Sequence, residues 1–306
     1  MNAPGTAARE QTYILNPVAG RRGRRRAAVL VEDLREAVPG AEILETARRG
    51  EAERLAAARR GQGNRVVIAV GGDGTVHEVG SGLIGGAAAL GVLPVGSGND
   101  FASMIAVPTG VEHAATFFST VPIRACDAGL VEWKNADGGG GRAAFINSMG
   151  LGFEGAVAAR AEILARLRGP WRYLVAVAVE LPGYRSTSIR LDLEGQRLEG
   201  RQFLLAIGNG RRAGGGFLLN PRARIDDGWL DVCRADDLPL HRLIGILPSV
   251  FRGAHGRHAG VHHLRCRQLK LASDPPTAVH LDGEVVTRSA VEVSVAVRAG
   301  QLRVAG

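Results

Sequence analysis

Cysteine, aromatic residues and long apolar runs are all scarce in this chain of 306 residues, and each scarcity excludes a class of protein. The 3 cysteines (Cys126, Cys233 and Cys266) are odd in number and show no CxxC spacing, which argues against structural disulfides and against a zinc site. The longest clean apolar run, residues 174–179, is far shorter than the ~20 residues needed to cross a bilayer. The opening MNAPGTAARE lacks the basic and apolar regions of a signal peptide, so we expect a cytoplasmic protein.

The chain carries a net charge of +8, and almost all of its basic residues are arginine. This balance suits an anionic partner, which means nucleotide phosphates, anionic lipid or nucleic acid. Aromatics make up only 5% of the chain, and no basic stretch is interleaved with them as a base-stacking surface requires, so nucleic acid is the least favoured. A general bias of composition towards arginine, alanine and glycine explains the charge equally well.

The length favours two domains, and the pattern of predicted elements changes near Val121. Before that point short apolar strands alternate with amphipathic helices, which predicts an α/β domain with a parallel, helix-covered sheet over residues 1–126. After it, strand-like segments separated by turns predict a β-rich, antiparallel, sandwich-like domain over residues 127–306, with helices near 156–181 and 240–253. We interpret NADGGGGR (135–142) as a hairpin loop, and we leave open a return of the last strand to the first domain.

Two glycine-rich loops follow buried strands. In VVIAVGGDGTVHEV (66–79) the glycines expose backbone N–H groups and a following helix adds its positive end, a combination that holds phosphate oxygens. Asp73 stands among these glycines and repels phosphate unless a cation lies between, so the loop implies Mg²⁺. In a parallel sheet the second loop, GSGND (96–100), reaches the same crevice, which places Asp100 on the same rim as Asp73. The simpler alternatives are a tight glycine turn and a helix cap at Asn99 or Asp100.

Other phosphate-binding loops are excluded. The chain contains no GxxxxGK[ST] and is therefore not a P-loop ATPase. Phe101 stands where a dinucleotide fingerprint needs its third glycine.

Five blocks of the chain occur in a recognisable order: NPVAG (16–20), GGDGTVHEV (71–79), LPVGSGNDFA (93–102), GGGFLLNPRARIDDGWLDV (214–232) and LDGE (281–284). The set resembles the diacylglycerol kinase catalytic-domain family, which includes bacterial diacylglycerol and phosphatidylglycerol kinases and the sphingosine and ceramide kinases. The resemblance implies an α/β ATP-binding domain, a β-rich lipid-substrate domain and an active site in the cleft between them. It also implies an ATP- and Mg²⁺-dependent lipid kinase, peripheral at the inner membrane surface, that acts on diacylglycerol or a related glycerolipid or sphingoid lipid.

Individual roles follow from this resemblance by position. It implies ATP contacts at Asn16, Pro17, Gly20, Arg21, Thr46, Gly71, Gly72, Asp73, Gly74, Thr75, Val76, His77, Gly96, Ser97, Asn99 and Asp100. Asp73 and Asp100 resemble the acids that organise Mg·ATP. Asp227, with the backbone carbonyls of Arg224 and Trp229, resembles a second, structural metal site. Asp282 and Glu284 match the segment that supplies the catalytic base, and of these two we favour Asp282.

Three positions depart from the usual pattern of the family. Arg21 replaces a lysine and keeps the charge, with a bidentate geometry towards phosphate. Ser97 replaces a threonine and keeps the hydroxyl, and Glu154 stands where an aspartate is more usual. The sequence offers no interpretation of the change at Glu154.

Two other functions are weighed against the lipid kinase. An NAD kinase shares GGDGT, but the NDF at residues 99–101 and the late LDGE oppose it. A nucleotide-binding regulatory protein without catalysis is opposed by the intact acids at 73, 100, 282 and 284. The identity of the lipid and the oligomeric state, a homodimer included, stay open.

Membrane contact is expected from two stretches. RRGRRR (21–26) starts a helix, where cations oppose the helix dipole, and we interpret it as a contact for ATP phosphate or for anionic lipid. The second stretch carries an apolar helical face made of Leu240, Leu243, Ile244, Leu247, Val250 and Phe251. We favour core packing as the explanation of that face, and we leave open that part of it contacts the membrane interface. We interpret His262 and His263 as solvent-facing rather than as metal ligands.

Overall fold

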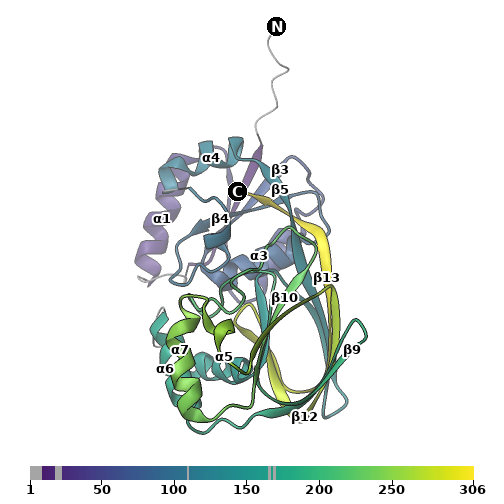
Figure 1. Ribbon diagram of the computed structural model, residues 1–306. Helices are drawn as coiled ribbons and strands as arrows, with labels where there is room; N and C mark the ends of the chain where they lie inside the picture. Colours follow the sequence, from purple (N-terminus) through teal and green to yellow (C-terminus); the bar gives the residue numbers. More distant parts are fainter. Residues whose placement is uncertain (1–8, 18–22, 109, 165–166, 168–169) are drawn as a thin grey trace. The chain divides into compact units, whose positions relative to one another are not determined.

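The computed structural model describes residues 9–17, 23–108, 110–164, 167 and 170–306 (Figure 1). The chain divides into two compact units. The first unit comprises residues 1–96, 105–126 and 301–306, and the second comprises residues 97–104 and 127–300. The last residues of the chain therefore belong with its beginning.

Strands alternate with helices along the first unit. The elements in chain order are β1 (Glu10–Leu15), α1 (Gly23–Ala37), β2 (Glu42–Glu45), α2 (Glu51–Ala57), β3 (Arg65–Gly71), α3 (Asp73–Leu83), β4 (Ala89–Pro94), η2 (Val111–His113) and α4 (Ala114–Thr120). Strand β1 pairs in parallel with β2 and with β3, and β3 pairs in parallel with β4. The end of β13 (Glu284–Ala305) joins β4, also in parallel, with Arg303 opposite Ala89.

The core of the first unit lies between this sheet and its helices. Strand β3 is the run RVVIAVG, and its residues from Val66 onward are buried, as expected for a strand covered on both faces. Leu34 of α1 and Phe118 of α4 are fully buried and pack in the same cluster as Ile68 of β3. Because Val31, Leu34 and Val38 recur at helical spacing, α1 turns one apolar face to the sheet.

The second unit is built mainly from antiparallel strands. They are β5 (Ile123–Asn135), β6 (Gly140–Phe145), β7 (Ser148–Gly152), β8 (Thr187–Leu193), β9 (Gln196–Gly208), β10 (Leu230–Asp236), β11 (Val261–Cys266), β12 (Gln268–Leu281) and most of β13. The β5–β6 hairpin closes over residues 135–140, which confirms the predicted hairpin loop. Strand β8 alternates between buried and exposed positions, the pattern of a strand with one face on the core.

Helices of the second unit form a separate apolar cluster. They are α5 (Phe153–Ile163), α6 (Pro170–Glu180) and α7 (Leu240–Val250), with the short helices η1 (Ala102–Met104) and η3 (His255–Arg257) (Figure 1). The sequence predicts one helical insertion near 156–181, and the structure has two helices there. Val157 of α5, Val177 of α6 and Val250 of α7 are buried together. No helix in the described residues is both long and apolar enough to span a membrane.

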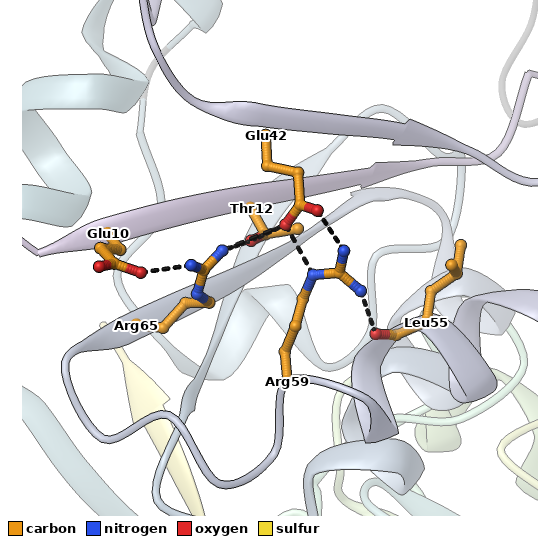
Figure 2. Close-up of polar contacts among 6 residues, drawn as sticks. All are labelled: Glu10, Thr12, Glu42, Leu55, Arg59 and Arg65. Atoms are coloured by element: carbon orange, nitrogen blue, oxygen red, sulfur yellow. Dashed lines mark hydrogen bonds and ion pairs between the residues drawn. The ribbon is translucent and has the colours of Figure 1, made fainter.

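A charged network fastens the amino ends of the strands in the first unit (Figure 2). Glu42, the first residue of β2, accepts hydrogen bonds from Arg59 Nε at 2.7 Å and from Thr12 Oγ1 at 2.9 Å. It also pairs with Arg65 of β3 at 3.1 Å, and Arg65 in turn pairs with Glu10. Hydrogen bonds from Arg59, opposed by burial and helped by Thr12, lower the pKa of Glu42 from 4.5 to about 2. This network lies at the opposite edge of the sheet from the carboxyl ends of the strands.

Replacing Glu42 by glutamine is expected to lower the free energy of unfolding at neutral pH by about 1 kcal/mol, because the carboxylate is partly exposed and therefore screened. The pKa of Glu42 is lower in the folded protein than in the unfolded chain. Its contribution is therefore fully present above pH 4.5 and is lost as the pH falls towards 2. Urea unfolding of the variant and the wild type across this range checks the expectation. Glu53→Gln, an exposed acid on α2, is the matched control. A stability difference that does not change with pH would contradict the role of Glu42.

Candidate functional site

The carboxyl ends of the strands in the first unit meet at one edge of the sheet. Leu15 of β1 lies opposite Glu45 of β2 and Val70 of β3, and Val70 lies opposite Leu93 of β4. The residues that follow these strands therefore share one level. Asn16 N donates to the Val70 carbonyl at 3.3 Å, and Thr46 N donates to the Leu15 carbonyl at 2.9 Å. This edge brings together Asn16, Pro17, Thr46, Gly71 to His77 and Gly96, which all belong to the predicted nucleotide contacts.

Helix α3 begins at Asp73, directly after the second loop glycine. The preceding residue, Gly72, has extended backbone angles. It has no side chain and so cannot cap the first N–H groups of the helix. Val76 N donates back to the Gly72 carbonyl at 3.1 Å. Asp73 is thus the first residue of an 11-residue helix, at its positive end.

Two of the loop glycines are needed for close packing. A Cβ atom on Gly71 would lie 2.3 Å from Thr75 Oγ1, because the first turn of α3 folds back on the end of β3. A Cβ atom on Gly72 would lie 3.3 Å from the Cα atom of Gly96, so the two glycine loops approach each other backbone to backbone. Val95 N and Gly96 N both donate to the Gly71 carbonyl, at 3.1 and 3.3 Å. The glycines therefore do more than make a tight turn: they let two loops meet at one edge.

Asp100 belongs to the second unit and is almost fully buried. Its Oδ2 atom accepts a hydrogen bond from Gly215 N at 2.8 Å. Gly215 is the centre of a triple glycine whose φ angles are all positive, a conformation that other residues rarely adopt. The Asp100 side chain therefore holds this glycine loop. Because Asp73 lies in the other unit, the expected sharing of one rim by Asp73 and Asp100 stays a prediction.

Asp100 lies in the segment 97–104 of the second unit, together with Ser97 and Asn99. Asn99 has φ of 56°, and its carbonyl accepts a hydrogen bond from Ser103 N at 3.1 Å. Ser97 precedes it in the same segment of the second unit. Gly20 and Arg21, together with the rest of the first basic stretch up to Arg26, lie outside the residues whose side chains the structure describes.

The LDGE block forms a two-residue hairpin turn between β12 and β13. Leu281 lies opposite Glu284, and the two turn residues, Asp282 and Gly283, have φ angles of 50° and 88°. Positive φ at both positions is typical of an Asp-Gly type I′ turn. The Asp-Gly dipeptide thus makes a tight turn. It fixes where the two acids lie.

The carboxylate of Asp282 is bound by backbone. It accepts hydrogen bonds from the N–H groups of Ile146 at 2.9 Å, Asn147 at 3.0 Å and Ser148 at 2.7 Å. The Asp282 N–H donates to the Ser148 carbonyl at 2.7 Å. Both oxygens of Asp282 therefore anchor the connection between β6 and β7. Glu284 lies two residues on and remains partly accessible to solvent.

A buried acid, Glu154, and a buried histidine, His280, lie beside the β12–β13 turn. The sequence did not predict this pair. Glu154, on α5, lies 3.3 Å from His280 Nε2. His280 Nδ1 accepts a hydrogen bond from Gly283 N at 3.3 Å, so the ring contacts both the turn and Glu154. A Cβ atom on Gly283 would lie 2.7 Å from the Tyr173 hydroxyl, which places Tyr173 against the turn from α6. Glu154 is thus connected through His280 to the turn.

Carboxylates also gather around Trp229. Asp227 accepts a hydrogen bond from Trp229 N at 3.1 Å and pairs with Arg265, which also approaches Asp231 at 3.4 Å. Burial raises the pKa of Asp231, Arg265 opposes the shift and the charge of Asp227 adds to it. Asp231 was not among the predicted site residues, although it follows Asp227 in the same sequence block. Its position two residues after Trp229, in the same block, is the signal by which the sequence could have identified Asp231.

Asp127 ties this region to the last strand. Its two carboxylate oxygens accept hydrogen bonds from Gly228 N at 2.6 Å and from Gly300 N at 2.8 Å. Asp227 and Asp231 supply carboxylate oxygens, the ligand type that Mg²⁺ and Ca²⁺ prefer. In the structure Arg265 contacts both carboxylates.

Comparisons with known proteins agree with this division of the chain. Residues 11–131 match the family described as "Diacylglycerol kinase catalytic domain", and residues 147–306 match "YegS C-terminal NAD kinase beta sandwich-like domain". A Pseudomonas aeruginosa protein named "Probable lipid kinase YegS-like" is 32% identical over 283 residues, covering 91% of this chain and 88% of the relative. A Mycobacterium tuberculosis protein named "Diacylglycerol kinase" is 29% identical over 221 residues, covering 69% of this chain and 68% of the relative.

Solved structures share the fold. A diacylglycerol kinase from Bacillus anthracis has a TM-score of 0.68 at 19% identity, covering 98% of each chain. A yeast NADH kinase in complex with NADH has a TM-score of 0.57 at 12% identity, covering 97% of this chain and 82% of its own. Both solved proteins thus share the fold of this chain.

Proposed function

Since the chain belongs to the lipid kinase family of YegS-like proteins and diacylglycerol kinases, we propose that it transfers the γ-phosphoryl group of ATP to a hydroxyl of a membrane lipid. Diacylglycerol or a related glycerolipid or sphingoid lipid is the acceptor. The observation that carries the proposal is the start of α3, where Asp73 lies at the positive end of a helix beside closely packed glycines. A helix N-terminus with exposed N–H groups suits phosphate, and an acid beside it suits phosphate that carries a cation.

Nucleotide phosphates would lie at the carboxyl edge of the first unit. The N–H groups at the start of α3 would bind phosphate oxygens, with Asn16 and Thr46 beside them at the ends of β1 and β2. Asp73 would hold Mg²⁺. When bound, Mg²⁺ neutralises charge on the phosphates, which is the main requirement of phosphoryl transfer together with positioning.

The acceptor hydroxyl needs a base, and the hydrogen bonds favour Glu284 over Asp282. Both oxygens of the Asp282 carboxylate already accept backbone N–H bonds, so this side chain holds the turn. We therefore propose that Asp282 positions the turn and that Glu284 takes the proton. The lipid oxygen then bonds to the γ-phosphorus, the bond from that phosphorus to the bridging oxygen breaks, and ADP leaves.

The carboxylates around Trp229 would hold a second, structural cation. Asp227 and the backbone carbonyls of Arg224 and Trp229 supply its oxygen ligands, with Asp231 as a further candidate. Arg265 occupies the same charge environment and would move aside.

NAD phosphorylation is the alternative that the fold alone leaves open, because an NADH kinase shares it. The motifs NDF and LDGE and the 32% identity to a YegS-like relative support the lipid instead. The test is to supply γ-labelled ATP and Mg²⁺ with separate acceptors: diacylglycerol, phosphatidylglycerol, sphingosine, ceramide and NAD. Label in a lipid supports the proposal, and label in NAD alone overturns it.

A lipid kinase must reach its substrate in a bilayer, and the helices of the second unit offer an apolar surface for this. Among described residues, large exposed hydrophobic side chains include Trp171 at 70%, Val179 at 52% and Ile244 at 55% exposed, on α6 and α7. Leu240 and Phe251 extend the α7 stripe. Both helices contribute to the same buried cluster (Figure 1).

Charge around α7 suits an anionic bilayer. Residues 240–260 contain no acid, and Arg242, Arg252 and Arg257 are all exposed. Core packing explains the other side of α7, since Leu243, Ile246 and Leu247 pack in the helical cluster. The predicted apolar face is thus shared between core and surface. We propose peripheral membrane contact through α6 and α7.

Ile244→Ser and Trp171→Ser are each expected to weaken binding to phosphatidylglycerol vesicles about tenfold, because each removes an apolar group worth about 1.5 kcal/mol when buried. High salt should weaken wild-type binding, since each basic group near anionic lipid contributes ~1 kcal/mol. Vesicle sedimentation measures both effects. Val29→Ser is the control, because Val29 is similarly exposed at 51% but lies on α1 of the first unit. Equal binding by all three variants, or binding insensitive to salt, would contradict this surface.

A further inference from the structure

Cys233, His255 and His263 come together in the second unit from three different elements. Cys233 lies on β10 and His263 on β11, directly opposite each other in the antiparallel pair, while His255 begins η3. Residues directly opposite on paired strands point to the same face of the sheet. One donor atom from each of the three residues lies within 4.8 Å of the other two.

The distances match those between ligands of one metal ion. Cys233 Sγ lies 3.5 Å from His255 Nε2, and the two histidine rings are 4.9 Å apart between centroids at 63°. With metal–sulfur and metal–nitrogen bonds of about 2.3 and 2.0 Å, tetrahedral zinc places its sulfur and nitrogen ligands about 3.5 Å apart. The cluster is already close to that spacing.

His255 Nε2 faces two groups that suit the same ion. The His255 side chain is 2% exposed, and Nε2 lies 3.1 Å from the Leu219 carbonyl oxygen as well as 3.5 Å from Cys233 Sγ. Tetrahedral zinc places nitrogen and oxygen ligands about 3.3 Å apart, so an ion bound to Nε2 would have the Leu219 carbonyl within reach. The other ring nitrogen, Nδ1, would then carry the proton.

Gly256 makes room for His263. A Cβ atom at this position would lie 2.6 Å from His263 Cδ2 and 2.9 Å from His263 Nε2. Only glycine therefore allows the His263 ring to lie against η3 beside His255. His263 is exposed, so an ion can enter from solvent on that side.

Burial raises the pKa of the Cys233 thiol to about 12, so the thiol is protonated before a metal binds. It must lose that proton when the metal binds.

We propose that Cys233, His255 and His263 form a Zn²⁺ site, with water or the Leu219 carbonyl as the fourth ligand. One thiolate and two imidazoles are a donor set that suits zinc. The ion would join β10, β11 and η3, and would thereby fix the segment that follows α7. The sequence argues against a zinc site because the ligands lack a short spacing, whereas strand pairing brings them together. The proposal is independent of the kinase assignment.

Calorimetric titration of the metal-depleted full chain with Zn²⁺ is the test. We expect one ion per chain, release of one proton per ion (measured by comparing buffers of different ionisation enthalpy) and a rise in the thermal midpoint with added Zn²⁺. Co²⁺ in place of Zn²⁺ should give a thiolate-to-metal absorption band.

Three variants locate the ion. Cys233→Ser and His263→Ala should each weaken Zn²⁺ binding at least tenfold, and Cys233→Ser should abolish the Co²⁺ band. His263→Ala removes an exposed side chain and therefore tests the site even if the buried serine disturbs folding. Cys266→Ser is the matched control, because Cys266 is equally buried and burial also raises its pKa to about 12. No saturable binding by the wild type, or unchanged affinity in Cys233→Ser and His263→Ala, overturns the proposal.

Discussion

Asp73→Asn is expected to lower the rate of phosphoryl transfer by about 10³-fold while leaving the fold intact. A metal ion contributes several kcal/mol of charge stabilisation to such a transition state, and the neutral amide would hold that ion poorly. Asp73 is the first residue of α3 and is only partly buried, so the substitution removes little packing. The rate should recover in part at high Mg²⁺ concentration if the loss is one of ion binding.

Initial rates of lipid phosphorylation against ATP and Mg²⁺ measure this effect, with thermal unfolding as the check on folding. Asp33→Asn is the matched control, because it makes the same chemical change at an exposed position of α1. Turnover of Asp73→Asn at the wild-type rate would remove Asp73 from the mechanism.

Glu284→Gln and Asp282→Asn should fail in different ways. Loss of a general base typically costs ~10²–10⁴-fold in rate, so Glu284→Gln should show that loss in kcat with unchanged ATP affinity and unchanged thermal midpoint. Asp282→Asn should instead lower the thermal midpoint, because an amide cannot accept the three backbone N–H bonds that the carboxylate accepts. The two variants thus separate a base from a positioning residue.

Steady-state kinetics, ATP binding and thermal unfolding of both variants decide the assignment. Glu292→Gln, which removes an exposed acid from the same strand β13, serves as the control. If Glu284→Gln keeps a near-wild-type kcat while Asp282→Asn remains stable and loses activity, the roles are reversed. If both keep kcat, the base lies elsewhere.

Local features of the fold were predictable because they depend on neighbouring residues. The apolar run at 66–70 forms β3, and the glycine-rich stretch at 135–142 closes a hairpin. The helical insertion near 156–181 is two helices, and Pro170 stands at the first position of the second, where proline is favoured.

The chemistry of the candidate site was less accessible to sequence, because it depends on strand register. The LDGE block could be located, but which acid is bound by backbone depends on where the β6–β7 connection lies relative to the β12–β13 turn. The Glu154–His280 pair joins positions 126 residues apart, and neither residue type points to the other. Cys233 and His263 are likewise brought together only by the β10–β11 register.

The most direct measurement follows the label of γ-labelled ATP into lipid. Purified protein, Mg²⁺ and diacylglycerol in phosphatidylglycerol vesicles are incubated beside a parallel reaction with NAD, and the products are separated into organic and aqueous phases. The account predicts labelled phosphate esterified to the lipid hydroxyl in the organic phase with wild-type protein, and a loss of about 10³-fold with Asp73→Asn. Label that appears only in a phosphorylated NAD, or lipid labelling that Asp73→Asn leaves unchanged, would contradict it.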